Sequence, residues 1–362
     1  MSKIDELIEK LCPEGVEFRK LGDIVSTITT GKLNANAMVE KGKYPFFTCD
    51  AKPFTIDTYA FDAEAIIVSG NGSQVGHINF YKGKFNAYQR TYVISGCCVD
   101  LSIHYLLFYL KAYLRSYIFQ YSKKGSVPYI TMPMLQNFRI PIPPLEIQQE
   151  IVKILDAFTQ LEAELEAELE ARKIQYEYYR NHALTFDENK VPLSNLGDVY
   201  QFQYGKGNTI PTTGGNFPVY GSNGIVGSHD EFNSQDAPVI GHIGAYAGIV
   251  NWGAGKHFVT YNGVICKIKD GIDPRFGYHL LKKQNLRELA KDGSQPFVSY
   301  DKLNGVKVQI PNIRIQTEIA KLLDTFDTLV NNISEGLPAE ITARRQQYEH
   351  YRNRLLTFQE AS

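Results

Sequence analysis

The stretch PIPPLEIQQEIVKILDAFTQL, residues 141–161, returns later in the chain as IPNIRIQTEIAKLLDTFDTL, residues 310–329. At one constant separation the two segments match at polar and apolar positions alike, including Gln148 with Gln316 and Phe158 with Phe326. This period is far longer than the roughly 20 to 50 residues of a solenoid repeat. The match therefore indicates that a whole globular segment has been duplicated.

The match continues in both directions from this stretch. KKGSVPYI (123–130) pairs with KDGSQPFV (291–298), LGD (21–23) pairs with LGD (196–198), and QYEYYRNHALTF (175–186) returns as QYEHYRNRLLTF (347–358). The 362-residue chain is therefore an internal duplication from end to end, and each copy takes up nearly half of it.

Each copy has the same predicted plan. Short runs rich in Val, Ile, Thr, Tyr and Phe, interrupted by Gly and Asn, predict a mostly β unit, and a long helical segment follows it. One shorter helix interrupts each β unit, with Asp100 and Asp273 expected at matching N-cap positions. The expected domains are an N-terminal helical segment (1–14), a first β domain (15–142), a first long helix (143–188), a second β domain (189–310) and a second long helix (311–362).

The long helices are predicted to pair with each other. Ile151, Phe158 and Leu165 recur every seven residues, and such an apolar stripe needs a partner helix to cover it. The connectivity favours an antiparallel pair. In the second helix, Gly336 and Pro338 predict a break near 334–338. The expected fold class is therefore α+β, with two mostly β domains separated and joined by two long antiparallel coiled-coil helices.

Charge is distributed unevenly along the chain, although the formal net charge is only -1. Residues 15–140 carry 14 Lys and Arg against 8 Asp and Glu, and residues 190–309 carry 12 against 9. Residues 145–171 carry one Lys against eight acids. Basic globular parts joined by an acidic helix suit a protein that binds a polyanion. The same charges also suit an ordinary solvated surface, and composition alone does not separate the two.

Patterns for catalysis, metal binding and targeting were sought in the sequence. There is no GxxxxGK[ST] loop, HExxH, GxSxG or methyltransferase tetrapeptide, and the five cysteines form no CxxC pair. The N-terminus lacks the apolar block of a signal peptide, and no run is long enough to span a bilayer. We therefore expect a cytoplasmic, non-catalytic chain that holds no metal or cofactor of its own and does not contact a membrane.

The segment GNGSQVG, residues 70–76, resembles a phosphate-binding loop. Its glycines Gly72 and Gly76 match Gly244 and Gly248 in the second copy, while the residues between them differ. A strand-like run follows each loop, whereas a dinucleotide fold would require a helix there. The sequence therefore predicts a strand-turn-strand connection that displays residues 73–74 in one copy and 245–246 in the other.

The duplicated signatures, together with LCPEGVEFRKLGD (11–23) near the start and RRQQYEHYRNRLLTF (344–358) near the end, resemble the specificity subunit of type I restriction-modification enzymes. The resemblance covers essentially the whole chain. It implies that the two β domains are target recognition domains, each reading one half of a split sequence in double-stranded DNA. It also implies that the helices set the spacing and dock two modification (methyltransferase) subunits, with restriction (translocase and endonuclease) subunits added for cleavage in phage defence. S-adenosylmethionine, ATP and Mg belong to those partners.

Candidate DNA-binding residues were chosen by comparing the two copies. Loop positions that differ between copies suit base reading, because each copy would read a different sequence; shared basic and Gly-Ser positions suit the DNA backbone. The candidates are Lys32, Asn71, Ser73, Gln74, Lys84, Gln89, Arg90, Lys123, Lys124, Ser126, Lys206, His242, Tyr246, Tyr261, Asn262, Lys291 and Ser294.

Two other functions remain open from the sequence. A coiled-coil structural adaptor without sequence-specific DNA binding explains the helices, but not two basic domains that differ from each other. A self-contained nuclease or methyltransferase requires a metal cluster or a cofactor loop.

Overall fold

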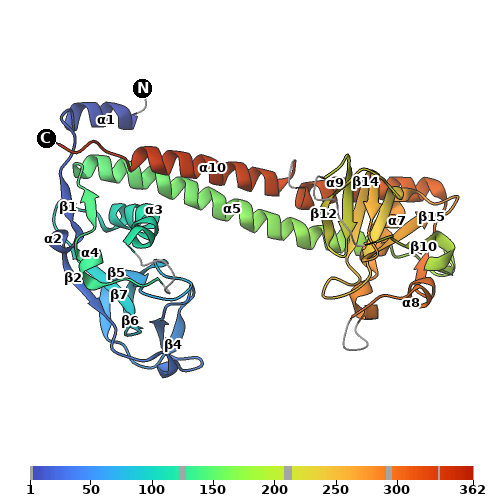
Figure 1. The fold of residues 1–362 in the computed structure, drawn as a ribbon, viewed down its shortest axis with the longest axis horizontal. Coiled ribbons are helices and arrows are strands. Elements are labelled where there is room, and N and C mark those ends of the chain that lie inside the picture. Colours follow the sequence, from blue (N-terminus) through green and yellow to red (C-terminus); the bar gives the residue numbers. More distant parts are fainter. Residues whose placement is uncertain (1–2, 122–127, 208–213, 291–295, 333–334, 362) are drawn as a thin grey trace. The chain divides into compact units, whose positions relative to one another are not determined.

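The computed structural model describes residues 3–121, 128–207, 214–290, 296–332 and 335–361. The chain forms two compact units (Figure 1). Unit 1 comprises Met1–Glu164 and Thr342–Ser362, and unit 2 comprises Leu165–Ile341. Each unit thus contains the globular part of one copy, the beginning of that copy's long helix and the end of the other copy's long helix.

A six-stranded mixed sheet forms the centre of unit 1, in the order β2-β7-β5-β6-β3-β4. Neighbouring strands are antiparallel except β3 and β6, which are parallel. The strands are β2 (Val25–Thr30), β3 (Tyr44–Phe47), β4 (Phe54–Ile56), β5 (Phe61–Ser69), β6 (Ile78–Ala87) and β7 (Thr91–Cys97). The last five residues of β5 are all buried, because Ile66 and Val68 enter one apolar cluster while Ala65 and Ile67 enter another on the opposite face.

The sheet of unit 2 has the same topology. Its order is β10-β15-β13-β14-β11-β12, with β11 and β14 parallel and the other neighbours antiparallel. The strands are β10 (Tyr200–Tyr204), β11 (Phe217–Gly221), β12 (Gly224–His229), β13 (Ser234–Gly241), β14 (Val250–Val259) and β15 (Gly263–Ile268). The predicted duplication and the α+β class are confirmed by this strand-for-strand correspondence.

Short elements complete each unit. In unit 1 these are α1 (Lys3–Leu11), β1 (Phe18–Lys20), α2 (Leu21–Ile24), η1 (Ala35–Ala37), α3 (Ile103–Tyr121), α4 (Met132–Gln136) and β8 (Arg139–Pro141). In unit 2 they are β9 (Leu193–Asn195), α6 (Leu196–Val199), α7 (Pro274–Lys283), η2 (Leu286–Ala290), α8 (Tyr300–Asn304) and β16 (Lys307–Gln309). The pairs β1·β8 and β9·β16 form matching two-stranded ladders.

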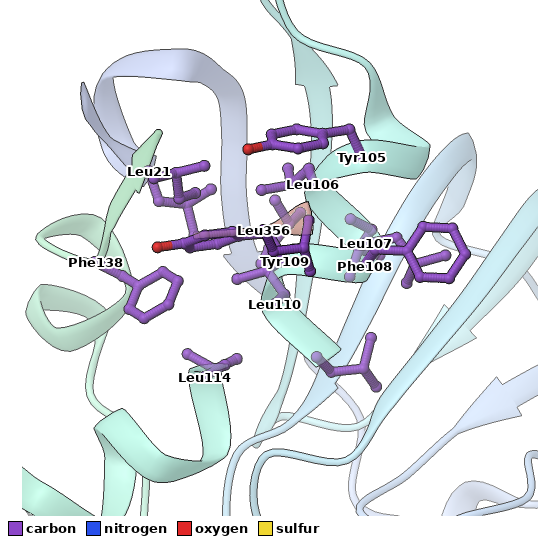
Figure 2. Close-up of a cluster of buried hydrophobic side chains, with 14 of the residues drawn as sticks. Leu21, Tyr105, Leu106, Leu107, Phe108, Tyr109, Leu110, Leu114, Phe138 and Leu356 are labelled. Carbon is purple, nitrogen blue, oxygen red and sulfur yellow. The ribbon is translucent and has the colours of Figure 1, made fainter. Parts of the chain in front are cut away.

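The core of unit 1 is built around α3, whose side chains pack against residues from distant parts of the sequence (Figure 2). Tyr105, Leu106 and Leu110 of α3 are completely or almost completely buried, and Leu356 from the end of the chain joins the same cluster. The buried hydroxyl of Tyr105 donates a hydrogen bond to the carbonyl of Pro141 at 3.1 Å, so this polar group is satisfied inside the core.

The long helical segments are α5 (Leu145–Ala183), α9 (Ile313–Asn331) and α10 (Leu337–Leu355). In unit 1, Phe158 of α5 stacks on Tyr351 of α10 with ring centroids 5.4 Å apart, and Glu162 pairs with Arg345. Because the α5 residues ascend while their α10 partners descend, the packing is antiparallel, as the sequence predicts (Figure 1).

Unit 2 repeats this contact with the roles of the two copies exchanged. Tyr179 near the end of α5 stacks on Phe326 of α9, with ring centroids 5.2 Å apart. Phe326 is the duplicate of Phe158, and Tyr179 is the duplicate of Tyr351. Each unit therefore joins the beginning of one helical segment to the end of the other through an equivalent aromatic pair.

The duplicated glutamines Gln148 and Gln316 are buried and make equivalent hydrogen bonds. Gln148 accepts from the N–H of Ser102 and donates to the carbonyls of Asp100 and Pro143. Gln316 accepts from the N–H of Asp273 and donates to the carbonyls of Gly271 and Pro311. Each glutamine thus fastens its long helix to the segment that precedes the shorter helix of its unit.

These bonds correct one expectation from the sequence. Asp273 does cap α7, since its carboxylate accepts from two backbone N–H groups of the first turn. Asp100 does not occupy the corresponding position, because α3 begins at Ile103 and the residue that matches Asp273 is Ser102. The Asp100 carboxylate instead accepts from Arg19 at 2.9 Å.

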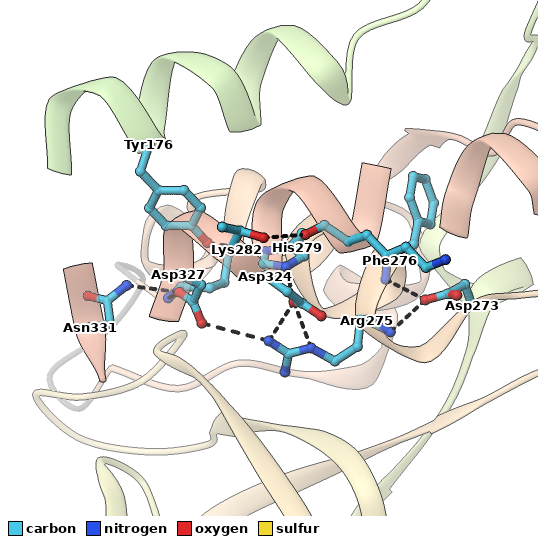
Figure 3. A network of polar contacts seen from close by, with 11 residues as sticks. Tyr176, Asp273, Arg275, Phe276, His279, Lys282, Asp324, Asp327 and Asn331 are labelled. Carbon is cyan, nitrogen blue, oxygen red and sulfur yellow. Dashed lines mark hydrogen bonds and ion pairs between the residues drawn. The ribbon is translucent and has the colours of Figure 1, made fainter. Parts of the chain in front are cut away.

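Unit 2 contains a partly buried polar network that joins α5, α7 and α9 (Figure 3). His279 is fully buried; its Nε2 lies 2.7 Å from Asp324 Oδ1, and its Nδ1 lies 3.1 Å from the hydroxyl of Tyr176. Arg275 donates to the same carboxylate at 2.8 Å. Burial lowers the pKa of His279, so a neutral imidazole donates to Asp324 and accepts from Tyr176.

Candidate nucleic-acid interface

The glycine loops occupy equivalent positions in the two units. In unit 1 the loop joins β5 to β6, and in unit 2 it joins β13 to β14; both strand pairs are antiparallel, which confirms the predicted strand-turn-strand connection. Gly72 and Gly244 have φ angles of 82° and 83°, and Gly76 and Gly248 have 77° and 84°. Residues with a Cβ rarely adopt such angles, which explains why glycine recurs at these positions while the residues between them change.

A short backbone framework beside each loop is also shared. In unit 1, the N–H of Gly70 donates to the carbonyl of Arg90, and the N–H of Ile130 donates to the carbonyl of Gly70. The N–H of Gln89 donates to the carbonyl of Leu33. All three distances lie between 2.8 and 2.9 Å. Four segments that are distant in sequence, at residues 33, 70, 89–90 and 130, are linked by these bonds.

Unit 2 has the same three bonds at the duplicated positions. The N–H of His242 donates to the carbonyl of Asn262, the N–H of Val298 donates to the carbonyl of His242, and the N–H of Tyr261 donates to the carbonyl of Gly207. The isolated bridges Asn71↔Tyr129 and Ile243↔Phe297 complete the correspondence. The framework therefore holds two sets of side chains at matching positions, and the two sets differ in chemistry.

We call these two sets the platforms. The platform of unit 1 is Lys32, Asn71, Gln89, Arg90 and Tyr129. The platform of unit 2 is Lys206, Ile243, Tyr261, Asn262 and Phe297. The lysines lie in the segments that carry Leu33 and Gly207 and are exposed in both units.

The platform of unit 1 is predominantly polar. Asn71, Gln89, Arg90 and Tyr129 line a cavity of about 360 Å³ that contains no acidic side chain. Asn71 is oriented by the thiol of Cys49, which donates to its Oδ1 at 3.0 Å. Tyr129 is 56% exposed. This cavity thus combines a cation, two amides and the rings of Tyr92 and Tyr129.

The platform of unit 2 exposes two aromatic rings. Tyr261 and Phe297 are 47% and 43% exposed. Behind them, Tyr204 stacks on Tyr300 with a centroid separation of 4.1 Å and lies 5.9 Å from Tyr261. The backbone N–H of Tyr204 also donates to the hydroxyl of Tyr300. The exposed ring of Tyr261 therefore packs against a further ring, which is itself stacked on another.

His242 has a different environment from the other candidates of unit 2. It is only 5% exposed, and its Nδ1 lies 3.1 Å from the carbonyl of Val298, so that nitrogen carries the proton and donates. Burial lowers the pKa of His242. Its ring lies 4.3 Å from that of Tyr204. The structure thus places His242 in the support of the platform, while Tyr246, at the tip of the glycine loop, is exposed.

The remaining candidates fall into three groups. Ser73 and Gln74 are exposed on the glycine loop of unit 1. Lys84 lies on β6, where its ammonium group is 4.6 Å from the centroid of the Tyr59 ring, so the structure does not bring it to the platform. The candidates Lys123, Lys124, Ser126, Lys291 and Ser294 lie outside the described residues.

Sequence comparison did not select two matched pairs that the structure brings to this region. Tyr129 and Phe297 belong to the platforms, and their separation equals that of Gln148 and Gln316. Arg115 and Arg287 lie beside the glycine loops, and their separation equals that of the loop glycines of the two copies. Agreement with the separation of the surrounding duplication is the signal that would have found Tyr129 and Phe297. Arg115 and Arg287 are related only by their place beside the loops, because the neighbouring helix residues Ser102 and Asp273 match at a different separation.

The described part of the chain shows no group of three or more His, Cys, Asp or Glu residues that could hold a metal ion. Among the described helices, none combines the length and the apolar composition that a membrane span requires.

Comparison with known proteins gives a consistent result. The family described as "Type I restriction modification DNA specificity domain" matches residues 13–171 and again 189–343. A putative type I restriction enzyme specificity subunit of Haemophilus influenzae (strain Rd) is 30% identical over 97% of this chain and 98% of its own. The EcoprrI specificity subunit of Escherichia coli is 35% identical over 66% of this chain and 64% of its own.

A solved structure has the same fold. The S subunit of a type I restriction-modification system from M. genitalium superimposes with a TM-score of 0.66 over 94% of this chain and 96% of that chain, at 18% sequence identity.

Proposed function

Because the chain belongs to the type I restriction-modification DNA specificity family, we propose that each unit reads one half of a bipartite DNA sequence through its platform. The chain is a specificity subunit and is itself non-catalytic. Recognition of DNA by a non-catalytic subunit requires side chains that touch base edges and others that hold the sugar-phosphate backbone. The platforms and glycine loops are where this chain presents such side chains.

The observation that carries the proposal is the contrast between framework and side chains. The same backbone bonds recur in both units, yet Asn71, Gln89 and Arg90 are replaced by Ile243, Tyr261 and Asn262. A structural role would favour the same side chains on the same framework. Different side chains on a common framework are what two readers of different sequences require.

The chemistry of the unit 1 platform suits hydrogen-bonded reading in the major groove. The guanidinium fork of Arg90 matches O6 and N7 of guanine, and the amides of Asn71 and Gln89 match N6 and N7 of adenine. The cavity that they line has no acid to compete for Arg90 or to repel phosphates. We therefore assign purine recognition in one half of the target to this platform.

The chemistry of the unit 2 platform suits contact with apolar surfaces of bases. Tyr261 and Phe297, together with Tyr246 of the adjacent glycine loop, expose aromatic surface that fits thymine methyl groups or base planes, while Asn262 supplies an amide. Such contacts depend on groove shape as well as on hydrogen bonds. We therefore assign a half-sequence with A·T pairs to unit 2.

The helical segments serve spacing and assembly in this proposal. The continuous helix α5 contributes residues to both units, so its length sets how far apart the two readers are placed. Modification subunits, two for each specificity subunit, dock on the helices and bring S-adenosylmethionine. Restriction subunits bring ATP and Mg for cleavage. In the cytoplasm this assembly marks host DNA and destroys foreign DNA.

The direct test of spacing uses a deletion in α5. Removing four residues within Glu162–Glu170 shortens a continuous helix by about 6 Å, at 1.5 Å per residue. We expect methylome sequencing of cells that express the variant with its modification subunits to show an altered spacer between two unaltered half-sequences. Altered half-sequences with the original spacer would contradict the assignment of spacing to the helix.

A structural adaptor remains the competing function, and salt separates the two. A DNA reader neutralises phosphates, so the logarithm of its binding constant falls linearly with the logarithm of salt concentration. We expect the chain with its modification subunits to bind its target duplex more tightly than a scrambled duplex, with a steep salt dependence for both. Absence of any preference for the target would support the adaptor.

A further inference from the structure

Each glycine loop has an arginine beside it. Arg115 lies on α3 and Arg287 lies in η2. Their separation in the sequence is the same as that of Gly72 from Gly244 and of Gly76 from Gly248. The guanidinium group is therefore a shared feature of two regions whose platforms differ.

In unit 1, the loop approaches the helix closely at this point. A Cβ on Gly76 would lie 3.6 Å from the Cα of Arg115 and 3.0 Å from Cδ1 of Ile118. Gln74, His77, Lys111 and Arg115 contribute to the lining of an open hollow of about 340 Å³, and no acidic side chain lines it. Two cations thus lie beside the loop tip, in a hollow that is large enough for a phosphate group.

In unit 2, the equivalent approach is closer still. A Cβ on Gly248 would lie 2.5 Å from the backbone N of Arg287. Arg287 donates from Nη2 to the carbonyl of Ala245 at 3.1 Å, which orients its guanidinium group along the loop. The corresponding hollow, of about 420 Å³, is lined by Arg287 and also by Glu288. Unit 2 therefore also has an arginine beside its glycine loop, but the hollow there is less positively charged because an acidic side chain lines it.

Side chains that are identical in both units cannot distinguish two different half-sequences. They suit the part of the ligand that is the same everywhere, and in duplex DNA that part is the phosphodiester backbone. A guanidinium group is well matched to phosphate oxygens in both charge and geometry. The glycine at each loop end lets the backbone approach the segment that carries the arginine, so the anchor is held next to the residues at the loop tip.

We propose that Arg115 and Arg287 are matched phosphate anchors, which fix the register of each unit on the DNA backbone while the platforms read bases. This inference rests on the proposed function. It assigns the phosphodiester group as the ligand of two arginine side chains. Base reading by the platforms does not itself require these two side chains. The absence of an acid in the lining of the hollow beside Arg115 makes its contribution the larger of the two.

The test measures affinity, salt dependence and sequence preference together. The full chain, assembled with its modification subunits, is titrated with a target duplex and with a duplex in which both half-sequences are scrambled, over a series of KCl concentrations. For Arg115→Gln we expect a roughly three- to tenfold loss of affinity for both duplexes and a decrease of about one in the salt slope. Arg287→Gln changes both quantities in the same direction by less. The methylated sequence stays the same.

Two matched variants sharpen the test. Arg314→Gln removes an exposed cation of α9 that pairs with Glu318 at 3.2 Å, and it is expected to leave the salt slope unchanged. Arg115→Lys keeps the charge but not the fork, and it is expected to retain the slope and most of the affinity, because a point charge serves for phosphate. A thermal unfolding curve of each variant serves as the control that the chain is still folded.

The outcomes separate the anchor from the reader. A changed base preference in one half-sequence, or loss of affinity for the target duplex alone, would overturn the inference and leave the proposed function standing. Slopes for Arg115→Gln and Arg287→Gln equal to that of Arg314→Gln would also overturn it. If the complex without any substitution did not prefer the target duplex, the proposed function would fail and this inference with it.

Discussion

Gln148 in unit 1 and Gln316 in unit 2 make the same set of hydrogen bonds, whereas Gln89 on the unit 1 platform is replaced by Tyr261 on the unit 2 platform. The two units therefore agree at these glutamines, which fasten the long helices, and disagree at this platform position. Duplication followed by divergence leaves this contrast when the framework must persist and the exposed surface must acquire a second specificity. The following changes probe both sides of it.

The largest expected effect comes from the matched glutamines. Gln148→Leu and Gln316→Leu each leave one buried N–H and two carbonyls without their partner, and we expect each to reduce the free energy of unfolding by about 3 kcal/mol. Gln160→Ala, at an exposed site of α5, is the control and is expected to change it by less than about 0.5 kcal/mol. Denaturant unfolding measures all three. A large loss in only one unit would show that the two frameworks are not equivalent.

Substitutions in the two glycine loops are expected to reduce stability by different amounts. Gly76→Ala and Gly248→Ala both force a residue with a Cβ into the left-handed region, which costs on the order of 1 to 2 kcal/mol. At Gly248 the added Cβ also meets the backbone of Arg287, whereas at Gly76 the nearest atom is the movable end of Ile118. We expect Gly248→Ala to be the more destabilising, by roughly 1 kcal/mol. Equal losses would mean that backbone strain alone determines the effect.

The aromatic pairs test whether the helix contacts are interchangeable. Double-mutant cycles to alanine on Phe158 with Tyr351 and on Tyr179 with Phe326 are expected to give coupling energies of about 1 kcal/mol each. Their centroid separations, 5.4 and 5.2 Å, and their near-parallel rings support equal values. A coupling energy near zero for one pair would show that its stacking contributes nothing to that unit.

The smallest expected effect is a pH dependence that belongs to unit 2. His279 is held neutral in the folded state with a lowered pKa, so the unfolded chain binds a proton more readily. The contribution of His279 to the free energy of unfolding is therefore fully present above the pKa of histidine in the unfolded chain, about 6.5. This contribution is lost as the pH falls below that value. The corresponding position of α3 in unit 1 is Phe108, which does not titrate.

His279→Phe makes unit 2 resemble unit 1 at this position. We expect denaturant unfolding between pH 7.5 and 5.5 to show a shallower fall in stability for the variant than for the unmodified chain. Part of the fall persists, because His242 and His257 of unit 2 are also buried with lowered pKa values. An unchanged pH profile would show that His279 does not contribute.

The fold could be predicted well from the sequence, because duplication leaves a signal at many positions at once. The recurrence of apolar, glycine and turn residues at a fixed separation identifies both sheets and the long helices without reference to distant contacts. Asp100 shows where this reasoning fails. Its place in the linear pattern resembles a cap, but α3 begins at Ile103, and it is the N–H of Ser102 that donates to Gln148, a contact between distant segments that the sequence does not reveal.

The candidate site could be predicted only in part. Asn71, Gln89 and Arg90 differ from their duplicates and are brought together by the framework. His242 also differs from its duplicate Gly70, yet it is buried, with the ring of Tyr204 against its own and the carbonyl of Val298 within hydrogen-bond distance. Variation between copies thus marks a position as different in the two units. Whether that position faces DNA depends on strand pairings that form only in the folded chain.

The most direct test of the central claim is methylome sequencing of cells that express the Arg90→Ala variant together with its modification subunits. Removal of a bidentate base contact is expected to cost about 1 to 3 kcal/mol of discrimination at the contacted position. The account predicts that methylation becomes relaxed at one guanine-containing position in one half of the target, while the other half and the spacer are unchanged. Relaxation in both halves, or an unchanged target at full methylation, would contradict it.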